Sequence, residues 1–171
     1  MTEHPDQAPA QPVPPSVWRN PWHFLAFGFG SGTLPKAPGT WGSLVAIPFI
    51  PLWQMLPDWG YWLMLGVTML FGFWLCGKVA DDLRVHDHEG IVWDEMVGMW
   101  ITLWLVPEGW WWLPIGFVVF RIVDILKPWP ISWVDRNVHG GVGIMLDDVL
   151  AGVFAWLVMQ GLVWGWVHWL V

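Results

Sequence analysis

Five apolar stretches separated by short polar segments organise the sequence. They cover residues 41–57, 60–78, 97–106, 110–120 and 149–171. The last contains no acid, lysine or arginine, and its length exceeds the roughly 20 helical residues that cross a bilayer core. The pattern predicts an all-α fold, an integral membrane helical bundle of about four to five hydrophobic helices.

The third and fourth stretches form either one spanning helix or a hairpin of two helices. The segment between them, "VPEGWWWLP", contains Pro107, Glu108, Gly109 and Pro114. Proline, glycine and an acid are unfavourable at the centre of a bilayer. This composition favours a helical hairpin with its turn near Glu108.

The lysines and arginines favour the same arrangement. They lie in the N-terminal region, in 78–95 and in 121–148. A hairpin places these three regions on one side, which the positive-inside rule assigns to the cytoplasm. A single span would place Arg121, Lys127 and Arg136 outside. We therefore predict an inside N-terminus and an outside C-terminus.

Overall composition excludes some classes of protein. The net charge of −7 and only 7 basic residues argue against a nucleic-acid partner. Cys76 lies in an apolar run, where a small core residue is the simplest interpretation. Residues 1–17, rich in Pro and Ala, predict a disordered tail without the features of a cleavable signal peptide, and 18–171 a single membrane-embedded domain.

Of the fourteen acids, all but Asp58 and Glu108 fall on the predicted cytoplasmic face. Charged loops are common, and this explains Asp81 and Asp82 well. It fits "VWDEMVGMW" and "VVFRIVDIL" poorly, because their charges interrupt apolar helical sequence, where ionisable groups need partners.

The hairpin predicts which of these charges meet. If 91–107 and 110–127 are antiparallel helices of equal rise, Asp94 and Glu95 reach the depth of residues 122–123. Arg121 and Asp124, three residues apart, share one helical face near that depth. Three carboxylates and one guanidinium should therefore lie close together.

A second acidic pair, Asp147 and Asp148, stands in "GIMLDDVLAG". These residues are expected either to cap the last helix, whose N-terminal dipole favours acids, or to join the other acids in binding a hard cation such as Mg²⁺. The Gly-rich stretch around Lys36 could offer backbone N–H groups to phosphate. "HGG" at 139–141 predicts a tight turn.

The basic residues and His88 have open interpretations. Lys36, Arg121, Lys127 and Arg136 could bind an anionic group or anchor the chain at the membrane surface. His88 could be an acid, a base or an ordinary loop residue.

At these residues the sequence resembles the phosphatidylglycerophosphatase A family of bacterial lipid phosphatases. The matching motifs are "FGFGSGTLPKAPGTWGSL", "HDHEGIVWDEMVGMWITL" and "FRIVDILKPWPISWVDRNVHGGVGIMLDDVLAG". The resemblance implies Mg²⁺ as cofactor, an anionic phospholipid as substrate, the inner membrane as location with the active site facing the cytoplasm, and the all-α fold of soluble relatives. Matched positions include Asp87, His88, Asp94, Glu95, Arg121, Asp124, Lys127, Asp135, His139, Asp147 and Asp148.

On this basis we assign roles to the site residues. The expected metal ligands are Asp94, Glu95, Asp124, Asp147 and Asp148; the catalytic residues are Asp87, His88, Arg121 and Lys127; the substrate-binding residues are Lys36, Arg136 and His139. An acid or His88 would activate water, and Arg121 or Lys127 would stabilise the charge of the transition state. Covalent attack by an aspartate remains open.

The expected reaction is Mg²⁺-dependent hydrolysis of phosphatidylglycerophosphate to phosphatidylglycerol and phosphate. The main alternative is a cation-coupled transporter or channel, because ion pathways also use acids at membrane depth. A transport pathway needs those acids near mid-membrane, whereas this sequence gathers them at one face. A non-catalytic scaffold is a third possibility.

Overall fold

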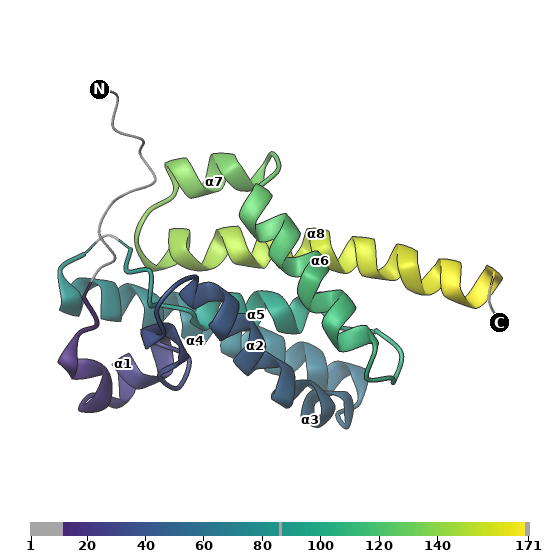
Figure 1. Ribbon diagram of the computed structural model, residues 1–171, viewed down its shortest axis with the longest axis horizontal. Helices are drawn as coiled ribbons and strands as arrows, with labels where there is room; N and C mark the ends of the chain where they lie inside the picture. The colour runs from purple at the N-terminus through teal and green to yellow at the C-terminus, as the bar shows by residue number, and fades with distance from the viewer. Residues whose placement is uncertain (1–11, 86, 170–171) are drawn as a thin grey trace.

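The computed structural model describes residues 12–85 and 87–169, and this part of the chain is helical without a strand (Figure 1). The α-helices are α1 Pro21–Ala26, α2 Pro38–Ala46, α3 Ile50–Gln54, α4 Asp58–Leu83, α5 Trp93–Thr102, α6 Trp112–Leu126, α7 Ile131–Asn137 and α8 Gly140–Trp169. Three short 3-10 helices join them, η2 Pro15–Trp18, η3 Ser31–Thr33 and η4 Ile47–Phe49. The predicted all-α class is confirmed.

Two helices among the described residues are long and apolar enough to cross a membrane, Asp58–Leu83 and Gly140–His168. The predicted bundle of four to five spans is not confirmed. Stretches 97–106 and 110–120 belong to separate helices, α5 and α6, of only 10 and 15 residues. Their separation excludes one continuous helix through this region.

The apolar stretch 41–57 is not one helix. It divides into the end of α2, η4 and α3, with Pro48 and Pro51 in the first turns of the last two elements. Proline has no backbone N–H and its ring clashes with the preceding turn, so it favours the start of a new helix over continuation of an old one.

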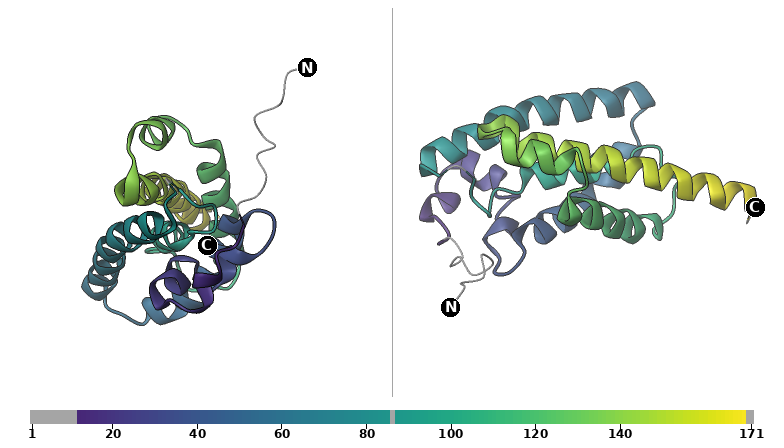
Figure 2. Two further views of the ribbon diagram at one scale, coloured as in Figure 1. Left: turned by 90° about the vertical axis from the view of Figure 1, so that its left-hand side faces the viewer. Right: turned by 90° about the horizontal axis from the view of Figure 1, so that it is seen from above.

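Helix α5 is the centre of the fold and packs against α2, α4, α6 and α8 (Figure 2). Nearly all of its residues are buried, including the large side chains Met96, Met99 and Trp100. Trp100 donates its indole N–H to the carbonyl of Ala46, 3.0 Å away, which ties α5 to α2. The helix at the centre of the core therefore also carries Asp94 and Glu95.

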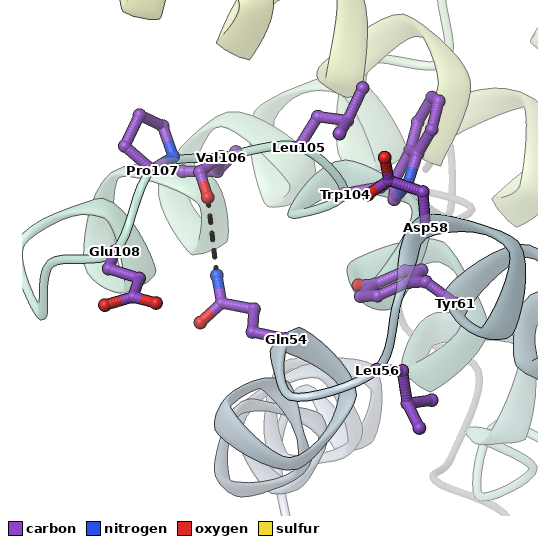
Figure 3. A pocket seen from close by; sticks show the side chains of 9 residues that line it. All are labelled: Gln54, Leu56, Asp58, Tyr61, Trp104, Leu105, Val106, Pro107 and Glu108. Carbon is purple, nitrogen blue, oxygen red and sulfur yellow. Dashed lines mark hydrogen bonds between the residues drawn. The ribbon is translucent and has the colours of Figure 1, made fainter.

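The chain passes repeatedly between two ends of the molecule. The C-termini of α4 and α6 and the N-termini of α5 and α8 lie towards one end, on the left of Figure 1, which we call the site end. The start of α4 and the turn between α5 and α6 lie at the other. There Gln54 donates to the carbonyl of Val106 at 3.4 Å, in a pocket shared by Asp58 and Glu108 (Figure 3). These two acids thus stand apart from the others, as predicted.

The last helix begins earlier than expected. Capping of this helix was one of the two interpretations of Asp147 and Asp148, but α8 starts at Gly140, about two turns before them. A tight turn was predicted at "HGG", residues 139–141. In the structure Gly140 has a left-handed φ of 70° and is the first residue of α8. The capping interpretation is wrong because Asp147 and Asp148 lie inside α8 and not in its first turn.

Glycines bring α8 into direct contact with its neighbours. A Cβ on Gly141 would lie 2.5 Å from the backbone N of Gly77 in α4. A Cβ on Gly152 would lie 2.6 Å from the carbonyl oxygen of Gly98 in α5. A side chain at either position would force the helices apart, so these glycines set the distance between backbones.

Large apolar side chains cover the outside of the long helices. On α4 they include Trp62, Leu63, Val67 and Leu70, each more than half exposed. Similar side chains on the other helices are Val118, Ile122, Ile125 and Leu126 on α6 and Leu157, Val158, Leu162 and Trp164 on α8. Apolar surface of this extent is unusual for a monomer in water and marks an interaction surface.

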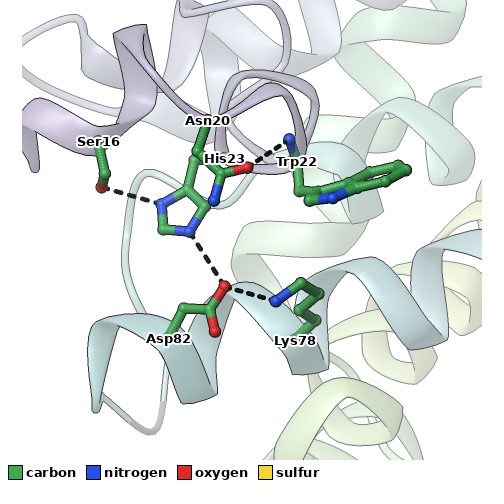
Figure 4. Close-up of polar contacts among 6 residues, drawn as sticks. All are labelled: Ser16, Asn20, Trp22, His23, Lys78 and Asp82. Carbon is green, nitrogen blue, oxygen red and sulfur yellow. Dashed lines mark hydrogen bonds and ion pairs between the residues drawn. The ribbon is translucent and has the colours of Figure 1, made fainter.

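The N-terminal segment is attached to α4 by polar contacts (Figure 4). His23 is buried between Ser16 and Asp82, with its ring nitrogens 3.0 and 3.3 Å from their side-chain oxygens. Lys78 pairs with Asp82 at 2.8 Å. Residues 1–11 of the predicted tail lie outside the described residues, whereas Val17 is fully buried. The packed domain therefore begins before residue 18.

Candidate active site

Three carboxylates meet at the site end. Asp94 and Glu95 lie in the first turn of α5 and Asp148 on α8, and one oxygen from each lies within 4.8 Å of the others. We call these three residues the acid triad. Asp94 and Asp148 are 8% and 4% exposed. The close contact between Gly98 and α8 fixes this spacing, since a Cβ on Gly98 would be 2.8 Å from the carbonyl oxygen of Asp148.

The acid triad is chemically suited to a divalent cation. Asp94 Oδ1 and Glu95 Oε2 are buried without a hydrogen-bond partner among the described residues. Carboxylates this close repel one another unless they share a cation or hold protons. Their oxygens are the ligands that Mg²⁺ and Ca²⁺ prefer. The residues present therefore fit a hard metal ion.

Two basic side chains form ion pairs beside the acid triad. Arg121 on α6 pairs with Asp124 at 2.6 Å, with side chains 14% and 12% exposed. Lys127, at the end of α6, pairs with Asp147 at 2.7 Å and also with Asp135 on α7. Asp124 and Asp147, both predicted as metal ligands, are thus each engaged by a basic side chain.

The prediction that Glu95 on α5 lies at the same depth as Arg121 and Asp124 on α6 is confirmed. Glu95 lies near Arg121 and Asp124, and Asp124 also lies near Asp148. The structure therefore brings all five predicted metal-binding acids into one region. It divides them into the three of the acid triad and two that hold basic residues.

Lys127 remains charged in this setting. Its backbone is left-handed, with φ 41°, which ends α6 and turns the chain towards α7. Burial by itself would lower the pKa of Lys127, but hydrogen bonds to Asp135 and Asp147 outweigh it and raise the pKa above its ordinary value. A permanent positive charge therefore faces the acids.

The N-terminus of α2 closes another side of the site. A Cβ on Gly39 would lie 2.1 Å from Glu95 Oε1 and 3.2 Å from an Arg121 terminal nitrogen. Lys36 and Ala37, just before α2, have left-handed φ values of 64° and 51°. Such strain in residues other than glycine is concentrated at functional sites. Lys36 is exposed and lies three residues before Gly39. Its expected contact with the substrate stays a prediction.

Gly39 was not identified by the sequence reasoning. Its only signal was its place in "PKAPGTWGS", a glycine directly after the proline that begins α2. Nothing in that local pattern shows that α2 approaches α5 and α6 at this residue.

The remaining predicted site residues lie around this centre. His88 is 6% exposed, accepts from the backbone N–H of Gly90 at 3.0 Å, and packs on Phe27 with ring centroids 5.2 Å apart. These contacts close the loop before α5. Asp87 is exposed and lies within electrostatic range of Cys76, which is also near Glu95 and Asp148. Catalytic roles for Asp87 and His88 stay predictions.

Two further predicted residues belong to the α7 side. Arg136 is exposed on α7 and donates through Nε to the carbonyl of Ser132 at 2.8 Å. His139 is exposed and directly precedes α8. Their contacts with substrate stay predictions as well.

The fold and site together define a class of protein, an all-helical enzyme with an apolar exterior and a buried group of acids and bases at one end. Comparison with known proteins makes this specific. The family model for phosphatidylglycerophosphatase A matches residues 24–163. The chain belongs to the phosphatidylglycerophosphatase A family and is a lipid phosphatase.

Individual relatives agree with the family. A phosphatidylglycerophosphatase A from Escherichia coli is 57% identical, over 80% of this chain and 80% of its own. One from Haemophilus influenzae is 46% identical, over 82% and 87%. A protein of Bacteroides thetaiotaomicron, 42% identical over 82% and 92%, is provisionally named a phosphatidylinositol-3-phosphatase. No solved structure matches the chain.

Proposed function

We propose that the chain hydrolyses the terminal phosphomonoester of phosphatidylglycerophosphate, giving phosphatidylglycerol and inorganic phosphate, with Mg²⁺ as cofactor. The observation that carries this proposal is the family match over residues 24–163, which includes the acid triad and both neighbouring ion pairs. The transporter alternative is not favoured, because the acids lie together at one end instead of along a path between the ends.

Each group of charges has a separate role in the proposed reaction. Asp94, Glu95 and Asp148 would hold Mg²⁺, which when bound would neutralise charge on the phosphate oxygens. Arg121 and Lys127 would bind the other phosphate oxygens and stabilise the charge that spreads over them in the transition state. Asp124 and Asp147 would keep these two side chains in place.

The hydrolytic step requires a base and a proton donor. In the proposed step a water oxygen attacks phosphorus and the ester P–O bond breaks. Asp87 or His88 would accept the proton of the attacking water and then return it to the departing glycerol oxygen. Attack by an aspartate, with later hydrolysis of the phosphoenzyme, is the competing route.

A purified-enzyme assay tests the proposed activity. Phosphate release from phosphatidylglycerophosphate in detergent should require added Mg²⁺ and should disappear with excess chelator. Asp94→Asn should abolish release, whereas Asp81→Asn, at an exposed acid on α4, should leave it unchanged. Folded protein that releases no phosphate from this lipid with Mg²⁺ would contradict the proposal.

A second lipid distinguishes the headgroups suggested by the relatives. Phosphatidylinositol 3-phosphate of the same acyl composition should be hydrolysed much more slowly than phosphatidylglycerophosphate. A reversed preference would assign the chain the activity in the name of the Bacteroides relative.

We also propose that the enzyme is a multi-pass inner-membrane protein with its site end in the cytoplasm. The apolar exteriors of α4, α6 and α8 and the gathering of basic residues at the site end support this. Reporters fused near Asp87 and Asp135 should indicate the cytoplasm, and one fused after Glu108 the periplasm. Reporters at Asp87 and Asp135 on opposite sides would refute the topology.

A further inference from the structure

An apolar groove lies between α4, α5 and α8, which run side by side (Figure 2). Its volume is about 520 Å³, within the range of about 300–1,000 Å³ typical of small-molecule sites. The groove is lined by Trp62, Leu65, Gly66, Met69, Ile101, Trp104, Val149, Val153 and Trp156. None of these side chains is charged, so the groove suits a hydrocarbon ligand.

The near end of the groove on α8 is at Val149, and from there the groove runs away from the site end. Val149 directly follows Asp148, and Val153 and Trp156 continue the same face of α8. From Val149 to Trp156 the helix advances roughly 10 Å at 1.5 Å per residue. On antiparallel α4, Met69 lies towards the site end and Trp62 towards the other. The groove therefore starts at about the depth of Asp148 along α8 and leads from there towards the opposite end of the molecule.

Three tryptophans close the far end. The ring centroids of Trp62 and Trp104 are 4.3 Å apart, and those of Trp104 and Trp156 are 5.4 Å apart. Trp156 donates its indole N–H to the carbonyl of Trp104 at 3.0 Å. Because this N–H is already bonded, Trp156 can offer its apolar ring face to the groove, whereas the buried indole N–H of Trp104 has no hydrogen-bond partner among the described residues.

We propose that this groove holds one acyl chain of the lipid substrate and so places the phosphate-bearing headgroup over the acid triad. The proposal rests on the proposed function, because it takes the substrate to be a phospholipid. An acyl chain gains little hydrophobic free energy on moving from a bilayer to an apolar groove. The benefit is orientation, because a chain fixed along α8 restricts where its headgroup can lie.

Gly66 gives a direct way to block the groove. It lines the groove, and a Cβ at this position would meet no atom within 4 Å. Gly66→Leu therefore fills open space, and leucine is also favoured over glycine in a helix interior. Gly161→Leu is the matched control, because Gly161 is an exposed α8 residue with equally open surroundings outside this groove. Both variants should fold.

The decisive measurement compares two substrates for each variant. Gly66→Leu should lower kcat/KM at least tenfold for long-chain phosphatidylglycerophosphate, and leave it unchanged for the water-soluble deacylated headgroup phosphate. Gly161→Leu should change neither. Equal activity of Gly66→Leu and wild type on the long-chain lipid would overturn the proposal, and so would an equal loss on both substrates.

A binding measurement keeps this proposal separate from the proposed function. A phospholipid carrying a photoreactive diazirine in the first half of one acyl chain should cross-link to Met69 or Val153 in the wild type, and much less in Gly66→Leu. Labelling spread evenly over α6 and α8 would indicate general lipid contact and overturn the proposal. Wild-type protein that cross-links in the groove but releases no phosphate would refute the proposed function alone.

Discussion

The ion pair between Arg121 and Asp124 allows a quantitative test of how the site is built. Arg121→Gln and Asp124→Asn each remove one charge with little change in shape, and the double variant removes both. With an N–O distance of 2.6 Å and an effective dielectric constant of about 20, the attraction is about 6 kcal/mol before desolvation is subtracted. Both side chains are largely buried, so the pair should behave as one unit.

The two single variants should differ in stability. Arg121→Gln leaves Asp124 without its counter-charge beside other acids, and it should lower the free energy of unfolding by about 3–5 kcal/mol. For a chain of this size that lowers Tm by about 6–20 °C. Asp124→Asn should be milder, at about 1–3 kcal/mol, because Glu95 remains near Arg121 as a second negative charge.

The double variant should recover stability but not activity. It should lie within about 1 kcal/mol of the wild type, a coupling of at least about 3 kcal/mol between the two residues. Phosphate release should stay at least 100-fold below the wild type, because the guanidinium that stabilises the transition state is gone. Thermal unfolding in detergent and phosphate release measure the two quantities on the same samples.

Two outcomes would refute this reasoning. Additive stability losses would show that the residues do not act as a pair, and recovered activity in the double variant would show that their role is only structural. The exposed pair of Lys78 and Asp82, 2.8 Å apart, is the control. Neutralising both of its members should show a much smaller coupling, because water screens exposed charges.

Further predictions follow from other features. Gly39→Ala should lower kcat about 100-fold with little change in Tm, because its Cβ displaces the flexible ends of Glu95 and Arg121 and no backbone atom; an equal loss in Gly161→Ala would refute this. Asp148→Asn should raise the Mg²⁺ concentration for half-maximal activity at least tenfold, and an unchanged Mg²⁺ titration would exclude it as a ligand. Deleting residues 2–11 should leave activity and Tm unchanged, whereas Val17→Ala should lower stability by about 1.6 kcal/mol in thermal unfolding. A deletion that abolishes activity in folded enzyme would contradict the first expectation, and an unchanged Tm in Val17→Ala the second.

The sequence predicted the arrangement of charges better than the path of the helices. Because helical rise is constant, the turn near Glu108 was enough to place Glu95 at the depth of Arg121 and Asp124. The separation of Asp58 and Glu108 from the other acids followed from the same counting. These features depend on distance along a helix, which a sequence records directly.

Features that depend on contacts between distant segments were missed. Glycines around 140–143 indicate a turn locally, and only the position of Gly77 on α4 makes Gly141 a helical contact. Likewise, the sequence could not show that Asp147 would pair with Lys127, because that requires the position of the end of α6 beside α8. The apolar groove was also invisible, since Gly66 and Val153 become neighbours only after folding.

Glycine contacts before and after Asp148 make the geometry of the site independent of the side chains on the outside of the molecule. Gly141 holds α8 against α4 before this residue, and Gly152 holds it against α5 after it. The spacing of the acid triad thus depends on backbone against backbone, not on the apolar side chains that face outwards. Exterior residues such as Leu63 and Leu157 could then be replaced by polar ones, which makes the enzyme a candidate for redesign into a water-soluble catalyst with its acid triad intact.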